Sequence, residues 1–235
     1  MKYAVITDVH SNVFALRAAL REIDKLRPDK IICLGDLVGN GFYPEETVSL
    51  IRERGDVLCV KGNHDFFVTA DLRRFSEDDP RVKVFRWQQK VLSAASKNFL
   101  SRLPLELNFT DGDYSITAFH YPLTPKGRFK DMKYLPSEED LKILFGDRKG
   151  DIFLFGHEHT GSLNCFDGKY YLNFGTTGNF LEKDAARFGI LDIDGKKVGY
   201  KAINAYYDDS LARKSTEMLN DILNKENKNK SGFNL

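Results

Sequence analysis

The stretch that decides the fold is Tyr3-Ala4-Val5-Ile6-Thr7-Asp8-Val9-His10, in which a short apolar run changes into a polar motif. A strand without polar positions is typical of a parallel sheet that is covered on both faces. After it, apolar residues recur at helical spacing between Val13 and Leu26, and Pro28 closes the segment. This stretch therefore predicts a strand, a polar loop and a helix, which together begin a βαβ unit.

Two more apolar runs repeat this pattern, because a polar motif follows each of them directly. Residues 31–34 precede Asp36, and residues 57–60 precede Asn63. Asp8 and Asp36 lie 28 residues apart, and Asp36 and Asn63 lie 27 apart, which is close to the roughly 30 residues of one βαβ unit. Right-handed crossovers place such strands side by side and parallel. We therefore expect the three polar residues to meet at the carboxyl edge of the sheet, where α/β proteins bind ligands.

The rest of the chain predicts helices first and strands afterwards. Residues 66–103 have apolar positions at helical spacing and are long enough for a helical, cap-like insertion. Strand-like runs follow at residues 105–109, 114–119, 152–155, 163–166, 170–173, 188–193 and 198–202. Asp-Gly pairs between three couples of these runs indicate hairpins, and apolar residues between 211 and 223 indicate a closing helix. We expect one domain over residues 1–223 and a disordered, Lys- and Asn-rich tail over residues 224–235.

The composition is that of an ordinary globular protein: 42% of its 235 residues are hydrophobic, 29% are charged, and the formal net charge is +1. This charge does not favour stable binding to nucleic acid or to a membrane surface. No apolar run is as long as a membrane span, and the first one reaches Asp8 too early to hold a signal-peptide core. We therefore expect a cytoplasmic protein. Cys33, Cys59 and Cys165 lack a Cys-x-x-Cys spacing and predict neither disulfides nor a zinc knuckle.

All of the histidines fall in or beside short polar motifs, and they are His10, His64, His120, His157 and His159. Histidine is the commonest metal ligand, and histidines with carboxylates suit manganese, iron or zinc better than sulfur-loving ions. Each piece also has a simpler explanation. His120 alone would be a structural histidine, and Asp8 and Asp36 could cap helices. The whole set favours a metal site, because no histidine remains for a structural role.

The motifs follow one another in a fixed order: Asp-x-His at residue 8, Gly-Asp-x-x-Gly at 35, Gly-Asn-His-Asp at 62, a single histidine at 120 and Gly-His-x-His at 156. In this order they resemble the motifs of the calcineurin-like metallophosphoesterases. The run Asp8-Val9-His10-Ser11-Asn12 is most similar to the small bacterial and archaeal phosphodiesterases of that superfamily. The resemblance covers residues 8–159. It implies an α/β (α+β) fold, a four-layer αββα sandwich of two mixed β-sheets flanked by helices.

The resemblance also implies a site for two divalent metal ions. The ligands that it assigns are Asp8, His10 and His159 for the first ion, Asn63, His120 and His157 for the second, and Asp36 as the bridge between them. A shared carboxylate holds two ions about 3.5–4 Å apart, the spacing of two-metal hydrolysis. We expect Mn²⁺ in this site, with iron, Zn²⁺, Ni²⁺ or Co²⁺ as alternatives.

The mechanism that the resemblance implies is attack on phosphorus by a water or hydroxide that both ions activate. His64 matches the substrate-facing histidine of the family, which binds the phosphate and could protonate the leaving oxygen; Asn63 also lies toward the substrate. Asp65 matches the residue that orients and charges the His64 imidazole. The expected activity is hydrolysis of a phosphodiester. The alternatives are a phosphomonoesterase, a protein phosphatase, a nucleotide pyrophosphohydrolase and a scaffold that has lost catalysis, although this chain keeps every ligand and His64.

Selection between esters would depend on the segments between the motifs. Directly after His120, the stretch 121–134 combines basic and aromatic residues, and we predict that Tyr121 and Arg128 contact a small phosphoester, such as a nucleotide. Arginines in the insertion are either phosphate contacts or a solvated helix face, and we favour the helix face; they are Arg73, Arg74, Arg81 and Arg86. Three positions depart from the family pattern, namely Phe174, Thr176 and Glu158. Residues 173–176 read Asn-Phe-Gly-Thr where Asn-Pro-Gly-Ser is frequent, and Glu158 replaces a frequent threonine.

Overall fold

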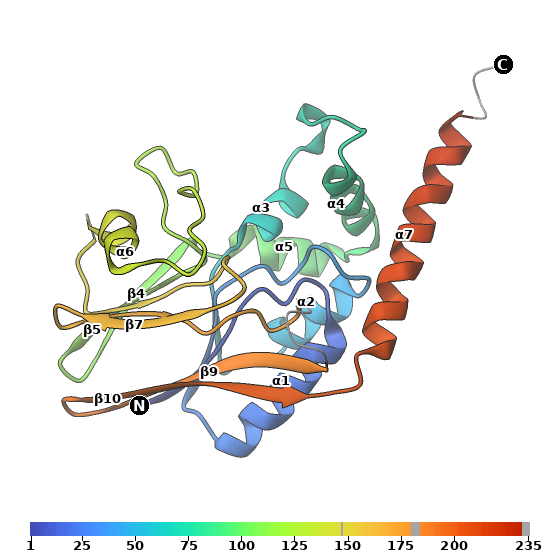
Figure 1. Ribbon diagram of the computed structural model, residues 1–235. Helices are drawn as coiled ribbons and strands as arrows, with labels where there is room; N and C mark the ends of the chain where they lie inside the picture. Colours follow the sequence, from blue (N-terminus) through green and yellow to red (C-terminus); the bar gives the residue numbers. More distant parts are fainter. Residues whose placement is uncertain (147, 180–183, 232–235) are drawn as a thin grey trace.

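The computed structural model describes residues 1–146, 148–179 and 184–231, which form two stacked five-stranded sheets with helices outside them (Figure 1). The first sheet has the order β10-β9-β1-β2-β3. Its strands are β1 (Lys2–Ile6), β2 (Lys30–Cys33), β3 (Val57–Cys59), β9 (Ala185–Asp194) and β10 (Lys197–Tyr206). As predicted, β1, β2 and β3 are parallel, and the crossovers are helices α1 (Val13–Leu26) and α2 (Pro44–Arg52). The predicted hairpin β9–β10 joins this sheet, with β9 antiparallel to β1.

The second sheet has the order β4-β5-β6-β8-β7. Its strands are β4 (Glu106–Asp111), β5 (Tyr114–Phe119), β6 (Ile152–Leu154), β7 (Ser162–Phe166) and β8 (Lys169–Asn173). The other two predicted hairpins are β4–β5 and β7–β8, whereas β6 is parallel to both of its neighbours. Helix α6 (Glu138–Phe145) was not predicted. It begins at a capping box in which the hydroxyl of Ser137 accepts the backbone N–H of Asp140.

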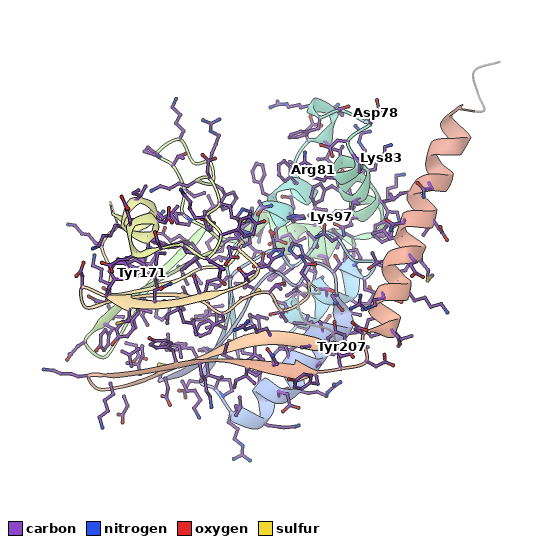
Figure 2. The ribbon with its side chains drawn as sticks, in the orientation of Figure 1. Asp78, Arg81, Lys83, Lys97, Tyr171 and Tyr207 are labelled. Atoms are coloured by element: carbon purple, nitrogen blue, oxygen red, sulfur yellow. The ribbon has the colours of Figure 1, made fainter. Side chains whose placement is uncertain are left out.

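Apolar side chains separate the layers, because alternate residues of a strand point to opposite faces of the sheet. Tyr3 and Val5 of β1 share a cluster of buried residues with Leu154 of the second sheet, and the alternate residues of β1 pack with α1. Beyond the second sheet, Tyr171 of β8 lies against Phe145 of α6, with ring centres 5.2 Å apart (Figure 2). The order helix, sheet, sheet, helix confirms the predicted four-layer αββα sandwich.

The predicted helical insertion is present. It contains α3 (Asn63–Thr69), the 3₁₀ turn η1 (Leu72–Arg74), α4 (Pro80–Val91) and α5 (Ala94–Arg102). Asp79 caps α4 and Pro80 occupies its first turn, as the sequence indicates. From the buried face of α4, Gln88 donates a hydrogen bond of 3.1 Å to the hydroxyl of Ser11, in the loop after β1. The insertion therefore lies beside the loops that contain the predicted metal ligands.

The predicted closing helix is α7 (Ser210–Ser231), whose outer end extends away from the sheets (Figure 1). Buried residues recur at helical spacing on its first turns, and they are Ala212, Ser215 and Leu219. The structure differs from the expected tail over residues 224–235, because residues 224–231 continue the helix; they contain neither proline nor glycine to stop it. Residues 232–235 lie outside the described residues. No helix in the described part of the chain is long and apolar enough to cross a membrane.

Candidate metal centre

The predicted ligands come together at the carboxyl edges of both sheets. Asp8 and His10 follow β1, Asp36 follows β2, Asn63 begins α3, His120 follows β5, and His157 and His159 follow β6. Four of these residues have a left-handed backbone with φ between 51° and 69°, namely Asp8, His10, Asp36 and His157. Residues other than glycine seldom adopt this conformation, and it is concentrated at functional sites.

Glycines allow the ligand loops to approach one another closely. A Cβ atom on Gly62 would lie 2.0 Å from Oδ1 of Asp36. One on Gly39 would lie 2.5 Å from Nδ1 of His64. Both separations are far shorter than van der Waals contact, so only glycine fits at these positions. The glycines of two sequence motifs are therefore explained by the proximity of the loops rather than by turns alone.

One group of donors consists of Asp8, His10 and His159. Oδ1 of Asp8 lies 3.3 Å from Nε2 of His159 and 3.7 Å from Nε2 of His10, and the two Nε2 atoms are 3.1 Å apart. Ligands about 2.0–2.1 Å from one ion lie roughly 3.0–3.4 Å from each other at angles between 90° and 109°. Oδ1 of Asp8 is buried and has no hydrogen-bond partner among the described residues. The three side chains are therefore spaced as ligands of one cation.

The second group of donors surrounds Nε2 of His120. This atom lies 2.9 Å from Oδ1 of Asn63, 3.2 Å from Nδ1 of His157 and 3.4 Å from Oδ2 of Asp36. The other ring nitrogen of His120 is 2.8 Å from the carbonyl oxygen of Leu34. When Nδ1 donates its hydrogen to that carbonyl, Nε2 is left with a lone pair for a metal. Asp36 is also close to His10 of the first donor group, so its carboxylate lies between the two groups.

The charges in this cluster balance one another. Burial acts to raise the pKa values of Asp8 and Asp36, but His120 and the other imidazoles outweigh it and hold both below their usual range. Burial acts to lower the pKa of His120, but the carboxylates of Asp36 and Asp8 outweigh it and raise this pKa to about 10. Burial lowers the pKa of His10 to about 4, and that of His157 also to about 4. A cation would therefore meet two ionised carboxylates and the neutral imidazoles of His10 and His157, and it would displace the proton of His120.

These observations fit divalent metal ions. The donors are imidazole nitrogens and carboxylate and amide oxygens, with no thiolate among them, which is the donor set of manganese, iron and zinc rather than of sulfur-loving ions. A bound ion would also supply the partner that Oδ1 of Asp8 lacks among the described residues.

Comparison with known proteins identifies the family. A model of the calcineurin-like phosphoesterases matches residues 1–161, which include every predicted ligand. The chain belongs to the calcineurin-like phosphoesterases. As a member of this family, it is a metal-dependent phosphoric ester hydrolase, and the predicted family and class of enzyme are confirmed.

The relatives of this phosphoesterase share most of its length. An uncharacterised protein from Methanocaldococcus jannaschii is 32% identical over 187 residues, which are 77% of this chain and 71% of the relative. A solved structure of a hypothetical protein from Pyrococcus horikoshii has a TM-score of 0.78 at 18% identity and covers 93% of both chains. A metallophosphoesterase from Sphaerobacter thermophilus has a TM-score of 0.71 at 24% identity and covers 94% of both. The two structures show that the fold is shared.

His64 of the phosphoesterase lies at the mouth of the metal centre. Its side chain is 20% exposed, and its ring packs edge-on against Phe85 of α4, with the ring centres 5.2 Å apart. Nε2 of His64 is 3.9 Å from Oδ2 of Asp36, while Nδ1 is buried without a hydrogen-bond partner among the described residues. The ring is therefore held next to both donor groups with an edge open to a substrate.

Asp65 has a different position from the predicted one. Its carboxylate is fully buried and accepts backbone N–H groups of Asp36, Leu37, Val38 and Gly62 at 2.8–3.3 Å. Burial and the nearby charge of Asp36 raise its pKa to about 7, although the backbone donors oppose this. The expected contact with the His64 imidazole is therefore wrong. Asp65 is a positioning residue that ties the loop after β2 to the start of α3.

The two predicted substrate contacts after β5 differ in exposure, since one is buried and the other is exposed. Tyr121 is 1% exposed, its hydroxyl accepts the backbone N–H of Lys133, and its ring centre lies 5.0 Å from that of His157. A buried ring has no surface to offer a substrate, so Tyr121 packs against the candidate ligand His157 instead. Phe129 does the same, since its ring is nearly parallel to that of His157 at 6.1 Å. Arg128 is exposed in this loop, and its contact with substrate stays a prediction.

Arginines of the insertion behave as a solvated helix face, which is the interpretation that the sequence favours. Three of them form exposed ion pairs within the insertion: Arg73 with Asp71, Arg81 with Asp79, and Arg86 with Glu77. Arg81 is labelled on α4 in Figure 2.

Two further residues contact or shape the loop of the candidate ligand His159; sequence reasoning singled out Glu158 and missed Asn179. Nδ2 of the Asn179 amide lies 2.7 Å from Nδ1 of His159. With the amide flipped, its oxygen would accept the Nδ1 hydrogen and leave the Nε2 lone pair for a metal. Glu158 is fully buried and accepts N–H groups of Thr160 and Gly161 and the hydroxyl of Thr160. It therefore shapes the turn around His159. Its departure from the family pattern was the available signal for Glu158, whereas nothing in the local sequence distinguishes Asn179.

Proposed function

We propose that this phosphoesterase is a phosphodiesterase with a dinuclear metal centre. The observation that carries the proposal is the meeting of two donor groups at Asp36, one with Asp8, His10 and His159 and one with Asn63, His120 and His157. Mn²⁺ is the ion that we propose, with iron, Zn²⁺, Ni²⁺ or Co²⁺ as alternatives, because mixed imidazole and carboxylate ligands suit all of them.

The bound ions would supply a deprotonated water near neutral pH and would withdraw charge from the phosphate. The side chains of the protein position the ester and move its proton. Asn63 contributes a neutral oxygen, which limits the negative charge beside an anionic substrate. His64 binds the phosphate through its open edge and, when protonated, donates a proton to the leaving oxygen. Phe85 packs against the His64 ring and restricts its rotation.

The first experiment compares esters and metals. Turnover of bis-p-nitrophenyl phosphate, p-nitrophenyl phosphate and a panel of nucleotides is measured with Mn²⁺, Mg²⁺, Zn²⁺, Ni²⁺ and Co²⁺ in turn. We expect the diester to give the highest kcat/KM, with Mn²⁺ as the best ion. A higher value for the monoester or for a nucleotide anhydride would favour the phosphatase or the pyrophosphohydrolase instead. Absence of turnover with all of the esters and ions would contradict the proposal.

The second experiment separates the role of His64 from that of Asp36. His64→Ala should leave the metal content intact and lower kcat about 10²- to 10⁴-fold, the usual effect of removing a general acid. Asp36→Asn keeps the shape of the side chain but removes the bridging charge, so it should lower the metal content itself. Metal per chain is measured by elemental analysis beside turnover. If His64→Ala lost its metal, the proposed division of roles would be wrong.

A further inference from the structure

A cavity with several polar lining residues opens directly beside the proposed metal centre. It has a volume of about 290 Å³, and its lining includes His159, Thr160, Thr176, Asn179, Arg187 and Asn204. His159 is a ligand in the first donor group, and Asn179 contacts its ring. A phosphate held at the metal centre would therefore have this cavity as its immediate neighbour, and the rest of the substrate could extend into it.

The fold explains why a cation lines this cavity. Arg187 lies on β9 opposite Asn204 of β10, on the face that also bears Leu191. Leu191 belongs to the apolar layer between the two sheets. Arg187 therefore points into the space between the sheets, at the end of β9 where the apolar layer gives way to the loops after β6 and β8. Those loops contribute Thr160 and Thr176 to the same cavity.

Arg187 has few hydrogen-bond partners among the described residues. Its Nε atom is buried without a hydrogen-bond partner among the described residues. One terminal nitrogen, Nη1, donates to the carbonyl oxygen of Thr160 at 3.5 Å, the limit of a hydrogen bond. Across residues 1–146, 148–179 and 184–231, the ion pairs within 4.0 Å include none with this guanidinium. A half-buried cation without a carboxylate partner favours an anionic ligand, and the planar guanidinium fork matches phosphate and carboxylate.

We infer that the Arg187 cavity binds a second anionic group of the substrate, a phosphate or a carboxylate carried by one of the groups that are esterified to the scissile phosphate. This inference rests on the proposed phosphoesterase site and names the class of ester that it would prefer. Esters with two neighbouring anions gain the Arg187 contact, whereas simple diesters do not. Arg187 is then a specificity-determining residue, and Asn179 lies between its cavity and the ligand His159.

The test is a binding measurement that needs no turnover. Orthophosphate, pyrophosphate and phosphonoacetate are titrated calorimetrically into the Mn²⁺-loaded protein, because the last two carry a second phosphate and a carboxylate, respectively. Arg187→Ala should weaken the binding of pyrophosphate, phosphonoacetate or both about 10- to 100-fold, as expected for a lost charge-assisted pair. Its affinity for orthophosphate should change less than about threefold. Weaker binding of pyrophosphate alone identifies the second anion as a phosphate, and weaker binding of phosphonoacetate alone identifies it as a carboxylate.

Two further variants keep this test decisive. Arg17→Ala removes an exposed arginine of α1 and should bind all three probes as the natural protein does. If Arg187→Ala folds poorly, Arg187→Gln replaces it in the test. Arg187→Gln keeps a polar side chain of similar length and should lose the same selectivity. Equal weakening of all three probes, or unchanged binding of pyrophosphate and phosphonoacetate, would overturn the inference. Turnover of bis-p-nitrophenyl phosphate is measured in parallel for the natural protein and for Arg17→Ala, and it should be retained in Arg17→Ala. Its absence from the natural protein would contradict the proposed function separately.

Discussion

At the scale of single residues, two consecutive residues of α3 have different roles. His64 and Asp65 are consecutive, yet one faces the mouth of the metal centre and the other binds backbone N–H groups. Both belong to the first turn of α3, where successive side chains point about 100° apart and do not face each other. The sequence motif shows that both residues matter, but only the helix geometry separates their roles.

Asn179 provides a prediction at this scale. Asn179→Ala should weaken metal binding about 10- to 100-fold, because it removes the group that orients the His159 ring. The dissociation constant is measured by titrating Mn²⁺ into metal-free protein. Asn98→Ala, which changes an exposed asparagine of α5, is the matched control and should bind Mn²⁺ normally. Equal affinities in both variants would mean that the contact with His159 has no function.

The candidate ligands could be singled out from the sequence because their side chains are rare and their order is specific, and their metal-binding role stays a prediction. His120 has no motif around it, and its assignment needed the resemblance to the family. Supporting residues could not be predicted in the same way. Asn179 and Gln88 act through contacts with His159 and Ser11, which lie far from them in the chain, and no local pattern marks either one.

At the scale of elements, a single carboxylate joins two helices. Glu45, in the first turn of α2, accepts the backbone N–H of Ser93 at 2.8 Å and the hydroxyls of Ser93 and Ser96 at 2.9 Å. Ser93 is the N-cap of α5, so α2 binds the exposed N–H end of another helix. Burial acts to raise the pKa of Glu45, but these hydrogen bonds and that of Ser49 outweigh it and lower the pKa.

We expect Glu45→Ala to lower the free energy of unfolding by about 1 kcal/mol at pH 7, the typical effect of losing a helix cap. The contribution of Glu45 is present above the pKa of the unfolded side chain and is lost as the pH falls through the lower pKa of the folded state. The difference between variant and natural protein should therefore shrink in acid. Urea unfolding of the variant and the natural protein, at pH 7 and at an acidic pH below the folded-state pKa of Glu45, measures this difference. Glu46→Ala, at the exposed next position, should have little effect.

Some helices and strands were easier to predict from the sequence than others. The three parallel strands were clear, since each apolar run ends in a polar motif. Helix α6 carries a signal that was overlooked, a capping box from Ser137 to Asp140. The hairpin β9–β10 was predicted, but its pairing with strand β1 was not. Pairing of β9 with β1 joins segments far apart in the chain, and no local periodicity specifies such a contact.

At the scale of the whole molecule, the proposed metal ligands come from both sheets. Asp8 and Asp36 extend from the first sheet, while His120, His157 and His159 extend from the second. Ions held by both sets of ligands would hold the sheets together at their carboxyl edges. Metal binding and the stability of the entire fold should therefore be linked.

Removal of the metal tests this linkage. At free Mn²⁺ of about 100 times the dissociation constant, binding adds about 2.7 kcal/mol to the stability of the folded state. For a chain of this size, this should raise the midpoint of thermal unfolding by roughly 5–10 °C over that of protein treated with a chelator. Asp36→Asn should lose most of the shift. Equal midpoints with and without Mn²⁺ in the natural protein would contradict the linkage.

The position of β1 also has a consequence for synthesis. β1 lies inside the first sheet, between β2 and β9, so one of its edges stays unpaired until β9 has emerged from the ribosome. Roughly 180 residues separate the two strands, and at about 5–20 residues per second their translation takes on the order of 10–40 s. Throughout that time the nascent chain presents an open, apolar strand edge, the kind of surface that chaperones bind and that otherwise pairs with other chains.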